Sequence, residues 1–204
     1  MLTSVYRLVR PRQFELVFKD ITMDNSHVIV HPIRLSICNA DQRYYQGLRA
    51  ENILKQKLPM ALIHEAIGRV VYDPTGSFKE GTLVVMIPNT PFEKDNIIAE
   101  NYLRSSKFRA SGFDGFMQEY VSMKPDRLVV LPEDINLSVA AFTEIVSVSY
   151  HAIQRFLRFS HERRNVIGVW GDGNLGYITS LLLKTILPNT KLCIFGVNEY
   201  KLHD

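Results

Sequence analysis

The chain has 204 residues, of which 46% are hydrophobic and 22% are charged, a balance typical of a globular protein that buries a core. This composition excludes a disordered chain, a collagen and a coiled coil as the main architecture. The formal net charge of +3 is small and scattered, so we do not expect nucleic acid as the main partner.

Two further features indicate the compartment. No apolar run reaches the roughly 20 residues that a membrane-spanning helix needs, and Arg7, Arg10 and Arg12 precede any long apolar stretch. The sequence therefore predicts neither a membrane span nor a signal peptide. Two cysteines, Cys38 and Cys193, are too few for a disulfide scaffold. The reducing cytoplasm is the compartment that fits this cysteine usage.

The chain before residue 136 has the pattern of short strands separated by turns. Apolar and β-branched residues concentrate in short runs, and Asp73–Gly76 and Ser111–Gly112 are typical turn sequences between them. The runs are VYRLV, FELVFKDI, HVIVHPIRLSIC, IGRVVYD, GTLVVMIP and GFMQEYVSM. Many short strands joined by loops predict a barrel or a sandwich.

A helix is predicted next, with Ser138 as its N-cap. Apolar residues then follow the i, i+3, i+4 spacing of a buried stripe at Phe142, Ile145, Val146, Ile153, Phe156 and Leu157. Two short apolar strands follow, VIGVW at 166–170 and KLCIF at 191–195. A helix from about Asn174 to Leu187 separates them, and Pro188 ends it. This pattern predicts a β-α-β unit with buried parallel strands.

The turn inside that unit reads G-x-G-x-x-G, with Gly171, Gly173 and Gly176 flanking Asn174 and Leu175. The first glycine allows a tight turn, the second lets a pyrophosphate approach the backbone, and the third permits close packing of helix on strand. Free amides at the helix start then bind the phosphates. A plain glycine-rich turn is the alternative, but the strand–turn–helix context favours dinucleotide binding.

The residue after the second strand indicates which nicotinamide cofactor is bound. An acid there would bind the ribose 2′-hydroxyl of NAD, whereas this chain has Gly196. Lys201 is close enough along the chain to pair with a 2′-phosphate, so the sequence favours NADP(H). The alternative is that Glu199 reaches back to the ribose and the site takes NAD.

Cys38, Asp41, His64 and Glu65 form a candidate metal site. Taken singly, a cysteine is usually a small core residue and a histidine a hydrogen-bonded polar group. A catalytic zinc takes three ligands of nitrogen, sulfur or oxygen type and leaves one position open. Cys38 and His64 would supply the sulfur and the nitrogen, and a third ligand is expected from later in the chain.

These segments together resemble the zinc-dependent medium-chain dehydrogenases. SICNADQRYYQG, LPMALIHEAIGRVV, GSFKEGTLVVMIP, DGFMQEYV and GDGNLG carry the resemblance, in the family's order and over essentially the whole chain. It implies an α/β protein with a GroES-like β-barrel catalytic domain at 1–137. The linking helix and first β-α-β of a Rossmann NADP-binding domain would occupy 138–204. Because one β-α-β unit leaves two open sheet edges, we expect the sequence to be a truncated part of a longer enzyme.

Within that family the chain is most similar to the reductases of ribulose 5-phosphate that act in bacterial teichoic acid synthesis. IPNTPFEKDNIIAENYL and WGDGNLGYI add to this closer match. The resemblance implies zinc-dependent, NADPH-linked reduction of ribulose 5-phosphate to ribitol 5-phosphate. It also implies a homodimer and, as pathway partner, a cytidylyltransferase that consumes the product.

Carried over by position, the resemblance makes Cys38 and His64 the first two zinc ligands, with Glu65 as a neighbour that exchanges with water. Asp41 would orient the imidazole. Glu144 matches the position where polyol dehydrogenases of the family have a third ligand; its alternative is an exposed helix charge.

The chain also departs from the family. Ala40 replaces the hydroxyl residue of the proton relay, which would then use water, Tyr44, Tyr45 or another group, and Ile63 replaces a glycine. The stretch matching the structural zinc lobe has no cysteine, so we expect one catalytic zinc and no structural zinc.

A sugar phosphate requires cations near the cleft. The candidates are Arg43, Arg104, Lys107 and Arg109, each of which could equally be a solvated charge. Two other functions stay open: an NAD-dependent dehydrogenase of an unphosphorylated polyol, and a truncated, non-catalytic zinc-binding module.

Overall fold

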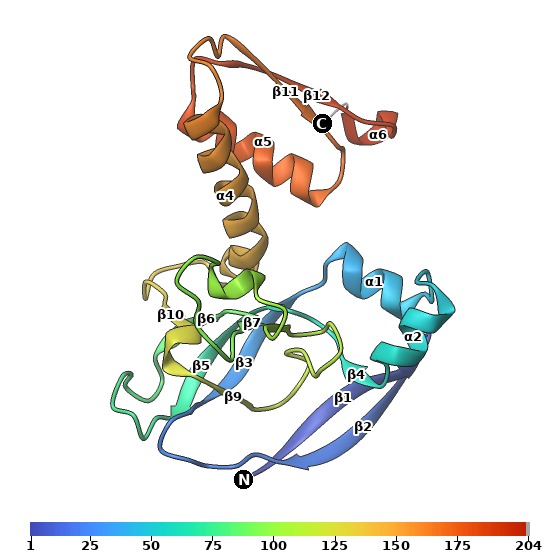
Figure 1. Ribbon diagram of the computed structural model, residues 1–204, viewed down its shortest axis with the longest axis vertical. Helices are drawn as coiled ribbons and strands as arrows, with labels where there is room; N and C mark the ends of the chain where they lie inside the picture. Colours follow the sequence, from blue (N-terminus) through green and yellow to red (C-terminus); the bar gives the residue numbers. More distant parts are fainter. Residues whose placement is uncertain (203–204) are drawn as a thin grey trace. The chain divides into compact units, whose positions relative to one another are not determined.

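The computed structural model describes residues 1–202 and divides the chain into two compact units, Met1–Phe142 and Thr143–Asp204. The elements of both units are drawn in Figure 1. The division falls a few residues after the expected boundary at 137/138, and the domain assignments made from the sequence stay predictions. None of the helices in the described part of the chain has both the length and the apolar character of a membrane span.

A three-stranded antiparallel sheet opens the first unit, in the order β2-β1-β4. Its strands are β1 (Leu2–Arg10), β2 (Gln13–Asp20) and β4 (Met60–Ala61). The turn between β1 and β2 places Arg12 at a φ of 64°, in the left-handed region. Thr3 and Val5, two residues apart in β1, are buried, as expected for a strand with one face on the core, and Leu8 is buried three residues further along.

The larger sheet of the first unit has five antiparallel strands in the order β10-β6-β5-β3-β9. They are β3 (Val28–Ser36), β5 (Glu65–Tyr72), β6 (Leu83–Met86), β9 (Val121–Met123) and β10 (Leu128–Val130). Buried aliphatic residues of these strands and Phe116 form one core cluster. Gly68 in β5 is required there, because a Cβ would lie 2.4 Å from a side-chain carbon of Val30.

Short elements connect the strands of the first unit. Helices α1 (Asn39–Tyr45) and α2 (Glu51–Lys57) lie between β3 and β4. The strands β7 (Asn89–Thr90) and β8 (Lys107–Phe108) pair with each other, with the 3-10 helix Glu100–Tyr102 between them, and a second 3-10 helix, Pro125–Arg127, precedes β10. The predicted strand GFMQEYVSM forms regular structure only in its last three residues, as β9.

The helix predicted to begin at Ser138 is two helices, α3 (Leu137–Ala140) and α4 (Thr143–Phe159). The N-cap assignment to Ser138 is wrong. The side chain of Asn136 accepts hydrogen bonds from the amides of Ser138 and Val139, and asparagine is at least as good a cap as serine.

The second unit contains the predicted β-α-β arrangement, but the predicted burial of its strands is wrong: only Ile167 of the two strands is buried. Strands β11 (Val166–Trp170) and β12 (Lys191–Phe195) pair in parallel, and α5 (Asn174–Ile186) connects them. Ile153 of α4, Ile167 of β11 and Leu183 of α5 form its buried core. A short helix, α6 (Glu199–Leu202), follows β12. The strand ends predicted for β11 and β12 are confirmed residue for residue.

Candidate metal centre and cofactor turn

Three potential metal ligands lie together at one end of the larger sheet. One ligand atom from each of Cys38, His64 and Glu65 lies within 4.8 Å of the others. The pairing of β3 with β5 brings them there, because it places Ser36 opposite Glu65 and so aligns the end of one strand with the start of the other. The sulfur of Cys38 is 4.0 Å from Nδ1 of His64.

Asp41 ties the two segments together. Its Oδ2 accepts hydrogen bonds from the amide of Cys38 (3.1 Å) and from the Cys38 thiol (3.0 Å), and its Oδ1 accepts from the amide of Ile63 (2.9 Å). Ile63 has a φ of 72°, a backbone conformation that glycine adopts freely and a β-branched residue rarely does. In the described contacts Asp41 fixes the backbone beside His64. Its role in orienting the imidazole ring stays a prediction.

The electrostatics of the three ligands favour a cation between them. Burial raises the pKa of the Cys38 thiol to about 12, and the carboxylate of Asp41 adds to the shift. Burial also lowers the pKa of His64 and raises that of Glu65. The side chain of Glu65 is buried, and within residues 1–202 its Oε2 has no hydrogen-bond partner.

A buried, unsatisfied carboxylate oxygen is costly. A divalent cation would satisfy it and would stabilise the thiolate, the neutral imidazole and the carboxylate together. The residues present therefore fit a metal ion.

Glu144, the predicted third ligand, lies in the first turn of α4 in the second unit. Its ligand role stays a prediction.

The glycine turn of the second unit has the backbone that its sequence predicts. Gly171 has a φ of 138°, which side chains rarely tolerate, and a Cβ on Gly176 would lie 2.0 Å from the carbonyl oxygen of Gly171. Gly173 is the N-cap of α5 and has open space around its Cβ position. Asn174 and Leu175 follow in the first turn of α5. The turn thus combines a backbone conformation that favours glycine at its first glycine, free space at the second and tight packing at the third.

Asp172, which the sequence analysis missed, holds the loop after β12. Its Oδ2 accepts hydrogen bonds from the amides of Val197 (2.9 Å) and Asn198 (2.7 Å). These bonds hold the pKa of Asp172 below its usual value, and the charge of Lys201 contributes. A Cβ on Gly196 would lie 2.5 Å from that of Asp172. Only glycine fits at 196 beside this carboxylate, so the missing acid at 196 reflects packing as well as cofactor choice.

The comparisons with known proteins agree with this geometry. The profile of the alcohol dehydrogenase GroES-like domain matches residues 24–133, more than half of the chain. The chain belongs to this family. The α/β architecture and the GroES-like domain predicted from the sequence are confirmed.

Relatives with assigned activities cover nearly all of this chain. It is 58% identical over 202 residues to a ribulose-5-phosphate reductase of Bacillus spizizenii and, equally, to ribulose-5-phosphate reductase 2 of Staphylococcus aureus; each match covers 99% of this chain and 59% of the relative. A crystal structure of S. aureus TarJ in complex with NADPH superposes with a TM-score of 0.81 at 48% identity, covering 100% of this chain and 56% of that one. The chain therefore spans a little over half the length of these relatives, and the predicted resemblance is confirmed.

In this GroES-like domain, the lobe without cysteines between β7 and β8 is held by polar contacts. Arg127 forms an ion pair with Glu100 (2.7 Å), Ser105 donates a hydrogen bond to Glu93, and Asp95 accepts from two backbone amides. The expectation that the protein has no structural zinc stays a prediction.

The four candidate phosphate ligands lie in different surroundings. Arg43 contacts the carbonyl of Leu48 (3.4 Å), Lys107 lies over the ring of Phe92, and Arg104 is exposed. Arg109 lines a separate cavity in the first unit.

Proposed function

We propose that this chain carries the metal centre and the first cofactor-binding turn of a zinc-dependent, NADPH-linked reductase that converts ribulose 5-phosphate to ribitol 5-phosphate for teichoic acid precursor synthesis. The observation that carries the proposal is the cluster of half-buried Cys38 and His64 with buried Glu65, one of whose carboxylate oxygens has no hydrogen-bond partner among the described residues. The 58% identity to two ribulose-5-phosphate reductases supports the substrate. The NADPH complex of a similar protein supports the cofactor.

In this proposal Cys38 and His64 hold the zinc ion, Glu65 lies beside it as an exchangeable ligand, and Glu144 completes the set. When bound, zinc supplies Lewis-acid polarisation of the substrate carbonyl. The chain's own residues fix the geometry. Asp41 locks the backbone at Cys38 and Ile63. The ring of Phe108 lies 5.2 Å from that of His64, centroid to centroid, and shields one side of the imidazole from water.

The glycine turn would bind the cofactor's pyrophosphate. The amides at the start of α5 would donate to a phosphate bound at the turn, and the open space at Gly173 would leave room for its close approach. Lys201 lies in α6, near enough to Asp172 to affect its pKa, and we assign it to the 2′-phosphate of NADPH. The protein's contribution to hydride transfer is position and charge, because the cofactor carries the redox chemistry.

We further propose that the full-length protein works in the cytoplasm as a homodimer with one catalytic zinc, and that a cytidylyltransferase consumes its product. Both cysteines in the described part of the chain are free thiols, which supports a reducing compartment.

The test is NADPH oxidation by the full-length protein with ribulose 5-phosphate, measured before and after metal chelation and with NADH in parallel. We expect turnover that is faster with NADPH, is lost on chelation and returns with zinc. Cys38→Ser and His64→Ala should abolish it, whereas Lys55→Gln, on the exposed surface of α2, should not. Turnover only with an unphosphorylated polyol and NAD would move the function to the first alternative. No turnover with any substrate despite bound zinc would favour the non-catalytic module.

A further inference from the structure

Backbone contacts with a distant segment hold the stretch of chain that leads into His64. The amides of residues 115–117 donate three hydrogen bonds of 2.6–3.2 Å to the carbonyls of residues 61–63. A Cβ on Gly115 would lie 2.3 Å from the carbonyl oxygen of Ile63. Only glycine therefore allows the two backbones to approach this closely, and residues 61–63 have little freedom to move.

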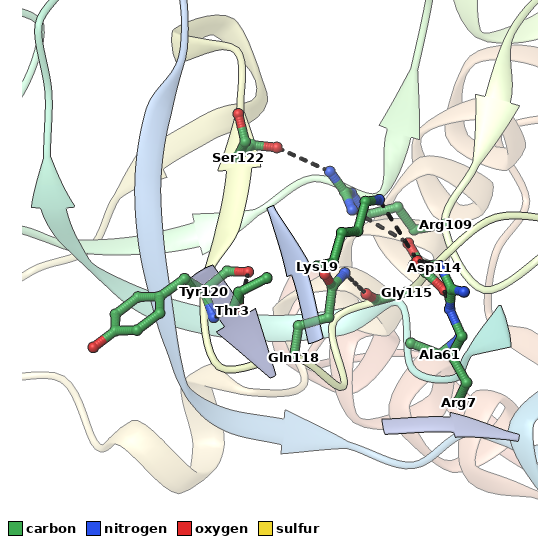
Figure 2. Close-up of polar contacts among 10 residues, drawn as sticks. All are labelled: Thr3, Arg7, Lys19, Ala61, Arg109, Asp114, Gly115, Gln118, Tyr120 and Ser122. Carbon is green, nitrogen blue, oxygen red and sulfur yellow. Dashed lines mark hydrogen bonds and ion pairs between the residues drawn. The ribbon is translucent and has the colours of Figure 1, made fainter. Parts of the chain in front are cut away.

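The buried carboxylate of Asp114 joins the same stretch to β1. Its Oδ1 accepts hydrogen bonds from the amide of Ala61 (3.0 Å) and from Nε of Arg7 (2.9 Å), and its Oδ2 accepts from Nη2 of Arg7 (2.7 Å). Figure 2 shows this carboxylate with its partners, among them Lys19, whose Nζ lies 3.8 Å away. A bidentate guanidinium–carboxylate pair fixes orientation as well as position, so Ala61 is bonded to a carboxylate that is itself held in place.

Ile63, the residue before His64, has a backbone conformation that needs such support. Its φ of 72° lies in the left-handed region, which is unfavourable for a β-branched residue. Conformations of this kind persist where the surrounding contacts determine them, and they cluster at functional sites. The amide of Ile63 donates to Asp41, and its carbonyl accepts from the amide of Phe116. Both polar backbone groups of the strained residue are therefore fixed.

We propose that Asp114 and Gly115 are positioning residues for the metal centre. They keep Ile63 in its left-handed conformation, which places the side chain of His64 beside Cys38. A metal site requires its ligands to be held within roughly 0.5 Å of the productive geometry, and these contacts supply that constraint at His64. Asp114 and Gly115 lie outside the ligand cluster and act through the backbone. This inference rests on the metal centre proposed above.

The experiment titrates the full-length protein with Co²⁺. The visible d–d bands report the coordination geometry, and a thiolate-to-cobalt band reports the bond to Cys38. Asp114→Ala removes the acceptor for the Ala61 amide, so we expect the Co²⁺ affinity to fall about 10- to 100-fold and the d–d bands to shift. Asp114→Asn should keep both the affinity and the bands, because its one carbonyl oxygen can take the place of Oδ1.

Thr3→Val is the matched control for a loss of stability alone. Thr3 is a buried residue of β1 whose hydroxyl donates to the carbonyl of Tyr120 (3.1 Å) and accepts from the Tyr120 amide (2.9 Å), as Figure 2 also shows. The variant loses these two hydrogen bonds and none to the stretch before His64. We therefore expect a lower melting temperature with unchanged Co²⁺ affinity and bands.

Two further changes separate positioning from folding and from charge. Asp114→Glu keeps the charge that pairs with Arg7 but moves the carboxylate by one methylene. Its Co²⁺ affinity should fall, and it replaces Asp114→Ala in the comparison if circular dichroism shows that Asp114→Ala does not fold. Glycine adopts a φ of 72° without the penalty that isoleucine has, so adding Ile63→Gly to Asp114→Glu should recover part of the lost affinity.

The outcomes distinguish this inference from the metal centre on which it rests. Unchanged Co²⁺ affinity and bands in the folded Asp114→Ala or Asp114→Glu variant would overturn the positioning role. Equal losses of affinity in Asp114→Ala and Asp114→Asn, or in Asp114→Ala and Thr3→Val, would overturn it as well. An unaltered protein whose Co²⁺ spectrum lacks the thiolate band would overturn the metal centre at Cys38, and this inference with it.

Discussion

Asp41→Asn examines how the metal-binding segments are held together. The carboxylate of Asp41 is buried and accepts hydrogen bonds from the amide and thiol of Cys38 and from the amide of Ile63. An asparagine keeps one acceptor oxygen, and in either orientation its amide group faces a donor that the carboxylate had satisfied. A hydrogen bond to a charged group contributes about 1.5–3 kcal/mol, and leaving a buried donor unsatisfied costs about 1–3 kcal/mol.

We therefore expect Asp41→Asn to lower the free energy of unfolding by about 3 kcal/mol. In a protein of this size that corresponds to a fall in melting temperature of roughly 6–12 °C. Zinc affinity should also fall, by about 10- to 100-fold, because an outer group that positions the ligands is altered.

The assay is thermal unfolding of the metal-free chain, followed by far-UV circular dichroism, with zinc affinity measured by chelator competition. Asp126→Asn is the matched control, because Asp126 pairs with Arg127 at the surface and its loss should cost less than about 1 kcal/mol. Equal melting temperatures for the two variants, together with unchanged zinc affinity, would refute the role assigned to Asp41.

Three other changes have expected outcomes. Gly176→Ala should unfold the glycine turn and abolish NADPH binding, because the new Cβ would lie 2.0 Å from a backbone oxygen. Gly173→Ala should keep the fold seen by circular dichroism and weaken NADPH binding measured by fluorescence. Normal NADPH binding by both variants would contradict the roles assigned to these glycines. Asp172→Asn should keep an acceptor for the two loop amides and remove a negative charge near the proposed 2′-phosphate position, so the ratio of NADPH to NADH affinity should rise severalfold; a ratio that stays constant would argue against that placement. Burial alone would raise the pKa of Asp114, but its bonds to Arg7 and to a backbone amide lower it below the usual value. Stability from Asp114 is therefore complete above its unfolded pKa and is lost as pH falls through the folded one. Urea unfolding should show a deficit of about 1.5–3 kcal/mol for Asp114→Asn at pH 7 that shrinks by pH 3; a deficit independent of pH would contradict this.

Local patterns predicted the second unit well. Its strands are short apolar runs bounded by a glycine turn and Pro188, so every boundary has a signal within a few residues. The N-cap of α3 shows the limit of such signals. Asn136 and Ser138 can both act as N-caps. Which of them does so depends on the path of the chain between Leu131 and the helix, and no rule based on neighbouring residues predicts that path.

The metal centre depends on contacts between distant segments. Cys38 and His64 meet because Ser36 pairs with Glu65 across two antiparallel strands, and no spacing rule gives that register. Only the family resemblance brought these residues together at the sequence level. Helices α1 and α2 were missed because neither has a strong apolar stripe, and α1 depends on the bonds of Asp41 to Cys38.

The other residues that were missed act through side-chain contacts with distant backbone. Asp172 binds amides that follow β12, and Asp114 accepts from the amide of Ala61 at 3.0 Å. An acid inside a glycine turn, with Gly196 directly after the next strand, is a signal that could have indicated the first contact. For Asp114, the arginines around it are spread over the sequence and give no local pattern.

X-ray absorption at the zinc edge of the zinc-loaded full-length protein tests the metal centre most directly. The account predicts one sulfur ligand with the rest nitrogen or oxygen, and loss of the sulfur contribution in Cys38→Ser. A site with several sulfur ligands, or a spectrum that Cys38→Ser leaves unchanged, would contradict the assignment of the metal to Cys38, His64 and Glu65.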